Sequence, residues 1–387
     1  MQRSATPTPP ADLVVAGAGV LGLALALDGV RRGMRVVVVE RDARPSGASV
    51  RNFGHVGVTA QTGTARRYAE LSRRRWLELG TQAGVSVRES GSLVVARTAA
   101  ELALLAEFTA AHDDESRLHT AAEVLELVPV AAAGLVGGAL LPRDLCVDPR
   151  QAVPALAEHL GRLGVDLRFG TTAAGASPGV LHTSRGDILG EHIVLALGND
   201  LDQLLPDQAA RAGIRRCTLH MLRVDPPGAR PIAPAVLSGT SLLRYSGFTA
   251  CAAAAAVRLE LTPELLEAGV NLMLTQQVNG ELIIGDTHSY DDMPTPFAAE
   301  DLDTLLLGEA QRLLGSGPLR VRERWRGTYA WANDREFLSV APAEGVRAVA
   351  VTAGIGMTTA LGLAPDLLDD LLAEPGRQNA SLPANTT

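Results

Sequence analysis

The stretch that decides the fold reads ADLVVAGAGVLG over residues 11–22, and a second apolar run, Val36–Val39, ends at Glu40. Residues 13–16 predict a buried parallel strand, residues 21–32 a helix, and Val36–Val39 a second buried strand. Three glycines at the first strand-to-helix turn form the pattern G-x-G-x-x-G: Gly17, Gly19 and Gly22. The segment therefore predicts a βαβ unit with a glycine-rich turn.

Each position of this unit suits a dinucleotide. Gly17 permits the tight turn, Gly19 lets the backbone approach a pyrophosphate, and Gly22 lets helix and strand pack closely. The helix start offers free N–H groups and the positive end of the helix dipole to phosphates. Glu40 ends the second strand, where a carboxylate accepts hydrogen bonds from a ribose diol. We therefore predict a dinucleotide-binding domain rather than a chance glycine-rich turn.

Length and composition narrow the class of protein. A chain of 387 residues, 47% hydrophobic and 20% charged, suits a globular protein of two domains. No apolar stretch has the length and flanks of a membrane-spanning helix, and residues 1–10 lack signal-peptide features, so a cytoplasmic location is expected. The net charge of −8 argues against a nucleic-acid partner, and the three scattered cysteines show no metal-binding or redox spacing.

The chain contains no lysine, and all 35 basic residues are arginine. This excludes Schiff-base chemistry, lysine-anchored pyridoxal phosphate and the P-loop lysine. A fixed cation at the site must be an arginine, a protonated histidine or a helix N-terminus.

A second glycine-rich strand-to-helix junction lies near the end of the chain. An apolar strand is expected over 346–352, then Gly354 and Gly356, then a helix through Leu372. Between the two junctions we predict helices over 64–80, 101–112, 121–128, 149–163, 249–267 and 300–314, and strands over 91–96, 165–169, 192–197, 217–224, 242–248, 271–277 and 281–285. Asn279-Gly280 is expected to join the last two strands as a hairpin.

Together these segments resemble the FAD-dependent amine and amino-acid oxidases, the family of D-amino-acid oxidase, glycine oxidase and sarcosine oxidase. The resemblance runs from about Asp12 to Leu372. The first junction matches that family's FAD motif, residues 193–200 its second flavin-contact strand, and residues 354–358 its C-terminal flavin loop. A narrower resemblance, over residues 47–54, 217–223, 280–290 and 354–358, is to a bacterial branch associated with phosphonate catabolism.

The resemblance implies an α/β fold: a Rossmann-like FAD-binding domain of the glycine oxidase and D-amino-acid oxidase type, with an antiparallel-sheet α+β substrate domain. We expect the FAD domain over 12–87, 146–215 and 327–375, the substrate domain over 88–145 and 216–326, and disordered tails over 1–11 and 376–387.

FAD is expected to bind non-covalently, because no cysteine follows Cys251 and some sarcosine oxidases attach flavin through a cysteine near the C-terminal flavin loop. The expected cofactor-binding residues are Gly17, Gly19, Val20, Leu21, Gly22, Glu40, Arg41, Ser49, Arg51, Asn52, Gly198, Gly354, Gly356, Met357 and Thr358.

The expected substrate side combines arginines with aromatics. Arginine offers a bidentate fork to a carboxylate or phosphonate, and aromatic walls favour amine cations. The substrate-binding candidates are Arg244, Tyr245, Arg326 and Tyr329, and the catalytic candidates are His55, His288 and Tyr290. The alternatives are surface salt bridges for the arginines, core packing for the tyrosines and a structural role for His55. Asp286 is interpreted as a structural hydrogen-bond acceptor.

The resemblance implies oxidation of the C–N bond of a small amine, with dioxygen as acceptor and hydrogen peroxide as product. Its narrower form implies 2-aminoethylphosphonate or an N-methylated derivative, giving phosphonoacetaldehyde. A glycine- or sarcosine-type oxidase, a flavin dehydrogenase, a nicotinamide-dependent dehydrogenase and a non-catalytic flavoprotein stay open. Either a histidine, such as His55 or His288, supplies the positive charge that promotes reaction with dioxygen, or dioxygen is a poor acceptor.

Overall fold

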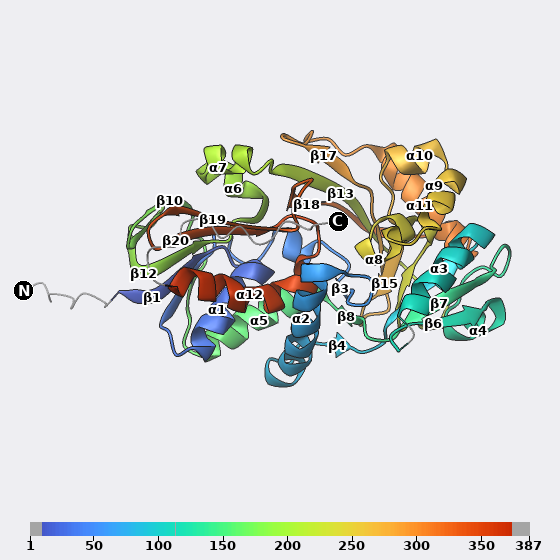
Figure 1. Ribbon diagram of the computed structural model, residues 1–387, viewed down its shortest axis with the longest axis horizontal. Coiled ribbons are helices and arrows are strands. Elements are labelled where there is room, and N and C mark those ends of the chain that lie inside the picture. The colour runs from blue at the N-terminus through green and yellow to red at the C-terminus, as the bar shows by residue number, and fades with distance from the viewer. Residues whose placement is uncertain (1–9, 113, 374–387) are drawn as a thin grey trace, which may run out of the picture.

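A computed structural model describes residues 10–112 and 114–373 of the chain. The first of its three sheets is the one that the glycine-rich unit predicts. Its centre holds β1 (Ala11–Ala16) between β2 (Val36–Val39) and β12 (Ile188–Leu195), with β9 (Asp166–Arg168) beyond β2 and β20 (Val346–Val351) beyond β12. These five strands run parallel. Figure 1 shows the blue β1 beside strands from the middle and end of the chain.

Helices cover one face of this sheet. α1 (Val20–Arg31), α2 (Gly63–Gln82), α5 (Pro149–Arg162) and α12 (Gly356–Leu372) pack their apolar side chains against Leu13, Val15 and Val38. Antiparallel strands extend the other side of the sheet: β10 (Ala173–Ser177), β11 (Val180–Thr183) and β19 (Phe337–Ala343). The sheet and its helices form the half of the molecule on the left of Figure 1.

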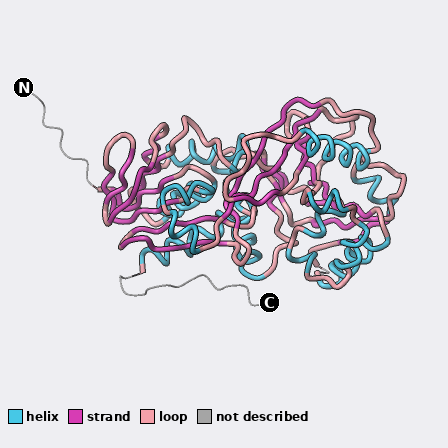
Figure 2. The backbone as a smooth tube through the Cα atoms, turned by 90° about the horizontal axis from the view of Figure 1, so that it is seen from above, coloured by secondary structure: helices cyan, strands magenta, loops and turns pink. Residues whose placement is uncertain are grey.

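A nine-stranded sheet organises the other half, which Figure 2 shows from above. Its order is β17 (Ser289–Asp291), β13 (Arg215–Val224), β16 (Leu282–Gly285), β15 (Met273–Gln276), β14 (Ala235–Leu237), β5 (Ser92–Ala96), β7 (Gly137–Leu141) and β6 (Arg117–Thr120), with β18 (Val321–Trp331) also on β13. Only the pairing of β14 with β5 is parallel among these described strands. The helices of this half are α3 (Ala99–Ala111), α4 (Ala121–Leu127), α9 (Ala254–Glu260), α10 (Pro263–Glu267) and α11 (Glu300–Leu314).

A three-stranded sheet joins the halves, with β8 (Leu145–Val147) between β3 (His55–Val56) and β4 (Val87–Arg88). The architecture confirms the predicted α/β fold class with its antiparallel second sheet. The division into domains at the expected boundaries stays a prediction. Residues 1–9 and 374–387 lie outside the described part of the chain, and of the expected N-terminal tail, Ala11 already belongs to β1.

Two local predictions were wrong. The strand expected over 242–248 is a 3-10 turn, η3 (Gly239–Leu243), followed by the short helix α8 (Ser246–Thr249). Its backbone N–H groups donate to carbonyls three residues back, as Arg244 does to Ser241, so they are not available to a sheet. The helix expected over 249–267 is broken, because Thr262 caps a new helix that starts at Pro263.

The hairpin at residues 271–285 formed as expected. β15 and β16 pair antiparallel, and Gly280 adopts φ +86° in the turn. No helix within the described ranges is long and apolar enough to cross a membrane.

Candidate active site

A large cavity lies where the parallel sheet meets the nine-stranded sheet. It encloses about 1040 Å³, at the upper end of the range for cofactor and ligand pockets. The starts of α1 and α12, the end of β2 and residues on β13 and β18 all contribute to its walls. Every residue predicted to bind the cofactor lines it.

The β1–α1 turn has the geometry that its glycines predict. Gly17 adopts φ +108°, and a Cβ there would lie 2.4 Å from the carbonyl oxygen of Ala196. A Cβ on Gly22 would lie 1.9 Å from the carbonyl oxygen of Gly17. At Gly19 a Cβ would meet only the Ser49 hydroxyl, at 3.2 Å, so the backbone there faces the cavity. Close approach of a ligand to this turn therefore depends on the missing side chains.

Polar groups surround the start of α1. Glu40 Oε2 accepts a hydrogen bond from the Ala18 N–H at 2.8 Å, and Ser49 Oγ accepts one from the Val20 N–H at 2.9 Å. Glu40 closes β2 at the cavity wall, the position from which a carboxylate reaches a ribose. The helix start thus combines a positive dipole with a carboxylate acceptor at the cavity wall.

Behind this turn lies the segment 47–54. Asn52 Nδ2 donates to the carbonyls of Ala48 and Ser49, and Asn52 Oδ1 accepts from the Gly54 N–H at 2.7 Å, so its amide shapes the loop. Arg51 is exposed and lines the cavity. Arg41, in the loop that follows β2, forms an ion pair with Asp200 at 2.6 Å. This ion pair ties the loop to the turn that contains Gly198.

The C-terminal junction forms the opposite wall. Gly354 adopts φ +72°, and a Cβ there would lie 2.9 Å from the Tyr329 hydroxyl and 3.0 Å from Arg244 Nη2. α12 then starts at Gly356, and Thr358 Oγ1 accepts the Gly57 N–H at 3.2 Å. Two helix N-termini therefore face one cavity, which fits an anionic dinucleotide such as FAD.

Arg244 is the cation of the predicted substrate side. Its Nε donates to His288 Nε2 at 3.2 Å, and its Nη2 donates to the Tyr329 hydroxyl at 2.9 Å and to the Ala353 carbonyl at 3.0 Å. Its Nη1 has no hydrogen-bond partner among the described residues, so two N–H groups stay available to a ligand.

His288 is a neutral support for this arginine. Burial, together with the charge of Arg244, lowers the pKa of His288 to about 3. Its Nδ1 donates to the Gly269 carbonyl at 2.9 Å, and Nε2 is then the acceptor for Arg244. The expectation that His288 supplies a positive charge is therefore contradicted.

Asp286, interpreted from the sequence as a structural hydrogen-bond acceptor, also lines the cavity. Asp286 is 4% exposed and accepts a hydrogen bond from Asn271 Nδ2 at 3.0 Å. Burial raises the pKa of Asp286 to about 7, against the opposing effects of Arg244 and Asn271. Its β16 neighbours are apolar, so only a spatial view shows that this acid faces the cavity.

Two predicted substrate-side residues do not line the cavity. The Arg326 guanidinium lies outside the cavity and donates to the carbonyls of Thr295, Pro296 and Phe297 in one loop. The Tyr290 ring packs 4.4 Å from the Trp331 ring. Tyr245, Tyr329 and His55 do line it.

Further lining residues carry weak sequence signals. Gln61 and Thr171 lie in loops whose composition points only to turns, whereas Asn199 lies in the 3-10 turn η2 (Gly198–Asp200), within the segment 193–200 that the family resemblance covers. Within residues 10–112 and 114–373, no group of three or more His, Cys, Asp or Glu side chains is arranged to hold a metal ion.

Comparison with known sequences gives a family match over most of the chain. The model of the family described as FAD dependent oxidoreductase (DAO) matches residues 12–369. A D-amino acid dehydrogenase from Phenylobacterium zucineum (strain HLK1) is 31% identical over 162 residues, 38% of this chain and 38% of that protein. A glycine oxidase from Geobacillus kaustophilus (strain HTA426) is 28% identical over 204 residues, 48% of this chain and 54% of that protein. These matches thus span about 38% and 54% of the relatives' lengths.

Solved structures share the fold over nearly the full length. A crystal structure of glycine oxidase from Geobacillus kaustophilus has a TM-score of 0.74 at 21% identity, covering 94% of this chain and 95% of that chain. Dithionite-reduced L-α-glycerophosphate oxidase from Mycoplasma pneumoniae, solved with FAD bound, has a TM-score of 0.76 at 16% identity, covering 97% of each chain. Since the family model spans the cavity walls at both glycine-rich junctions, this protein belongs to the DAO family of FAD-dependent oxidoreductases, and its cofactor is FAD.

Proposed function

We propose that this protein oxidises the C–N bond of a small amine that also carries an anionic group. Arg244 carries the argument, because its Nη1 faces a cavity that the two helix starts share. The two curated relatives, a D-amino acid dehydrogenase and a glycine oxidase, support a C–N donor.

In this proposal Arg244 binds the anion and His288 keeps the guanidinium in place. The contacts to His288, Tyr329 and Ala353 occupy Nε and Nη2, so the arginine presents one edge in a defined direction. A guanidinium held by several hydrogen bonds loses little further freedom when it binds a carboxylate or phosphonate. The fixed anion then sets which carbon of the substrate faces the cofactor.

When bound, FAD supplies the two-electron acceptor for the hydrogen that leaves the carbon next to nitrogen. The positive end of α12, which starts at Gly356, stabilises negative charge that develops beside it. The oxidised substrate is an imine, which water hydrolyses to an aldehyde or oxoacid and an amine. Dioxygen is the proposed final acceptor, with hydrogen peroxide as product.

Within this class, the first candidate substrate is 2-aminoethylphosphonate or an N-methylated derivative. The N-methylated compound, dioxygen and water would give phosphonoacetaldehyde, methylamine and hydrogen peroxide. The support is the narrower sequence resemblance over residues 47–54, 217–223, 280–290 and 354–358, together with an arginine rather than a lysine at the anion position.

The second candidate is an amino acid such as glycine or sarcosine. It is favoured by the names of the curated relatives, both of which refer to amino acids. Both candidates place an anionic group on Arg244 and differ in its charge and geometry.

Anaerobic mixing of purified protein with a panel of aminophosphonates, amino acids and plain amines separates the candidates. We expect bleaching of the oxidised-flavin absorbance by anionic amines and little by amines of the same length without an anion. Faster bleaching by glycine or sarcosine than by every aminophosphonate would reject the phosphonate candidate. Peroxide yield on readmission of air then distinguishes an oxidase from a dehydrogenase that uses another acceptor.

A further inference from the structure

The imidazole of His55 contacts the buried carboxyl group of Asp144. Its Nε2 lies 2.8 Å from Ser92 Oγ and 3.2 Å from Asp144 Oδ2, and the Asp144 side chain is 1% exposed. Antiparallel pairing of His55 with Cys146 in β3 and β8 brings Asp144, which immediately precedes β8, next to the imidazole. No sequence pattern links His55 to Asp144, which lies 89 residues later.

Asp144 is fixed as a carboxylate. Its Oδ1 accepts the N–H groups of Val58 at 2.8 Å and Thr59 at 3.0 Å, and the Thr59 hydroxyl at 3.3 Å. Burial alone would raise the pKa of Asp144, but the contacts with His55, Thr59 and Ser92 outweigh it and hold the pKa below the ordinary value. An ionised carboxylate only accepts hydrogen bonds, so the neutral imidazole carries its proton on Nε2.

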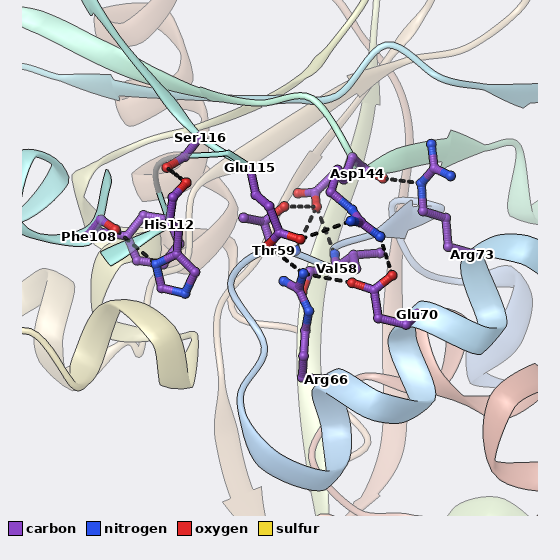
Figure 3. A network of polar contacts seen from close by, with 11 residues as sticks. Val58, Thr59, Arg66, Glu70, Arg73, Phe108, His112, Glu115, Ser116 and Asp144 are labelled. Atoms are coloured by element: carbon purple, nitrogen blue, oxygen red, sulfur yellow. Dashed lines mark hydrogen bonds and ion pairs between the residues drawn. The ribbon is translucent and has the colours of Figure 1, made fainter. Parts of the chain in front are cut away.

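A cluster of ion pairs joins helix α2 to the segments that contain Glu115 and Arg143, beside Asp144 (Figure 3). Arg143 contacts Glu70 and Glu115, and Arg66 contacts the same two acids at 2.7 and 2.5 Å. Arg66 also donates to the Val58 carbonyl at 2.9 Å, and Arg73 donates to the Arg143 carbonyl at 2.8 Å. The cluster thus fixes the backbone on both sides of the Asp144 contacts.

The opposite edge of the imidazole, which carries Nδ1, lies at the cavity. Nδ1 has no hydrogen-bond partner in the described chain, and His55 lines the cavity with its ring edge-on to Tyr245, 6.2 Å between centroids. A Cβ on Gly57 would lie 2.5 Å from His55 Cε1, so the ring occupies space that only glycine leaves open.

The other titratable groups beside His55 are neutral at physiological pH. Burial raises the pKa of both the Tyr245 hydroxyl and the Cys146 thiol. Ser92 has no charge. Asp144 therefore brings the negative charge to the imidazole, and that charge stabilises an imidazolium.

We propose that Asp144 is a positioning residue that holds His55 with Nε2–H inward and the Nδ1 lone pair toward the cavity, where His55 accepts the proton that a substrate ammonium must lose before oxidation. An N–H bond of the ammonium breaks, an Nδ1–H bond forms, and the resulting imidazolium pairs with the Asp144 carboxylate. The proton acceptance rests on the proposed function, while the tautomer of His55 does not.

The test is the holoenzyme with ¹⁵N-labelled histidine, with and without Asp144→Asn. The amide that replaces the carboxylate would keep its Oδ1 on the Val58 and Thr59 N–H groups and turn its Nδ2 toward His55. Both proteins carry Ser92→Ala, which removes the hydroxyl 2.8 Å from Nε2 that could otherwise accept its proton. Nε2 must then accept, so His55 should switch from the Nε2–H to the Nδ1–H tautomer. An unchanged tautomer in the variant would overturn the positioning role, whatever the substrate proves to be.

The second measurement is anaerobic flavin reduction by an amine that bleaches the wild type, followed against pH. We expect Asp144→Asn to lower the rate about 10²-fold at neutral pH and to lose the histidine limb of the profile, with the flavin spectrum unchanged. Asp187→Asn is the matched control, because Asp187 pairs with His182 at 2.9 Å on the exposed surface and its variant should behave as wild type.

His55→Asn covers the case in which Asp144→Asn does not fold, because it leaves Asp144 and its backbone contacts in place. The His55→Asn variant should also lose the histidine limb of the pH profile of flavin reduction. A wild-type pH profile in His55→Asn would overturn the proton acceptance. Failure of every amine to bleach the wild-type flavin would reject the proposed function and with it the proton acceptance, while the tautomer result would still decide the positioning role.

Discussion

Arg244 and Arg326 differ in what surrounds their guanidinium groups. Arg244 and Arg326 were both candidates for binding an anion, yet only Arg244 of the two lines the cavity. The guanidinium of Arg326 donates hydrogen bonds to three backbone carbonyls of one loop. Each of the two guanidinium groups makes three hydrogen bonds to the chain, so Arg244 differs from Arg326 in that it lines the cavity, where its remaining donors can meet a ligand.

Replacing Arg244 by Met tests the anion site. We expect the KM for an anionic amine to rise by about tenfold to a hundredfold, because one lost charge-assisted pair costs about 1.5–3 kcal/mol. The flavin spectrum should stay unchanged. Arg326→Met is the matched control, since it removes the same charge outside the cavity. Equal KM values for the two variants would contradict the assignment.

Asp286 gives the protein a pH-dependent stability of unusual sign. Its pKa is raised to about 7 from 3.8, so between roughly pH 4 and pH 7 the native state binds more protons than the unfolded state. Its contribution to the free energy of unfolding is therefore largest at low pH and is lost as pH rises, by on the order of a few kcal/mol.

Chemical denaturation of wild type and Asp286→Asn at several pH values measures this. The difference between the two isolates Asp286, because Asp144 and all other titrating groups are common to both. We expect the stability of wild type relative to the variant to decline from pH 5 to pH 8. A difference that stays constant across this range would show that Asp286 has an ordinary pKa.

At the scale of elements, the helices and parallel strands around the glycine turns agree with their apolar patterns, because buried parallel strands are continuous runs of Val, Leu and Ile. β18 was not predicted, because its sequence, VRERWRGTYAW, mixes charged and aromatic residues with a glycine and has no long apolar run. Its ten-residue partner β13 holds it in the sheet, and no local pattern in β18 shows that partner.

Gly19→Val tests the start of α1 as the pyrophosphate site. A Cβ there would meet only Ser49 Oγ, at 3.2 Å, so the side chain projects toward the cavity and requires only a small shift of the Ser49 side chain. We expect a folded protein, by circular dichroism, that retains no FAD after purification. Gly308→Val is the control, since a side chain there meets open space on α11. Retention of a full complement of flavin by Gly19→Val would contradict the placement.

At the scale of the molecule, the cavity is assembled from both ends of the chain, so FAD should act as a bridge between segments hundreds of residues apart. Cys146, Cys217 and Cys251 do not line it. We therefore predict that acid precipitation releases all the yellow colour into the supernatant as FAD. Colour in the pellet would indicate a covalent bond, and its loss in His55→Asn would locate that bond.

The cofactor half of the protein could be predicted from local sequence patterns. Glycines at fixed spacing, an apolar run before them and an acid after them are local patterns, and each has one backbone geometry that explains it. The same holds for the second junction at Gly354 and Gly356. Every cofactor residue predicted on this basis lines the cavity.

Which polar side chains share the substrate end of the cavity could not be predicted in this way, because it depends on how the folded chain packs. The pairs that matter are distant in sequence: Arg244 with Tyr329, and His55 with Asp144. Their burial, free donors and pKa values come from packing and desolvation, which no local pattern encodes. A histidine or arginine in a loop looks the same in sequence whether its nitrogen atoms face a ligand or a carbonyl of its own chain.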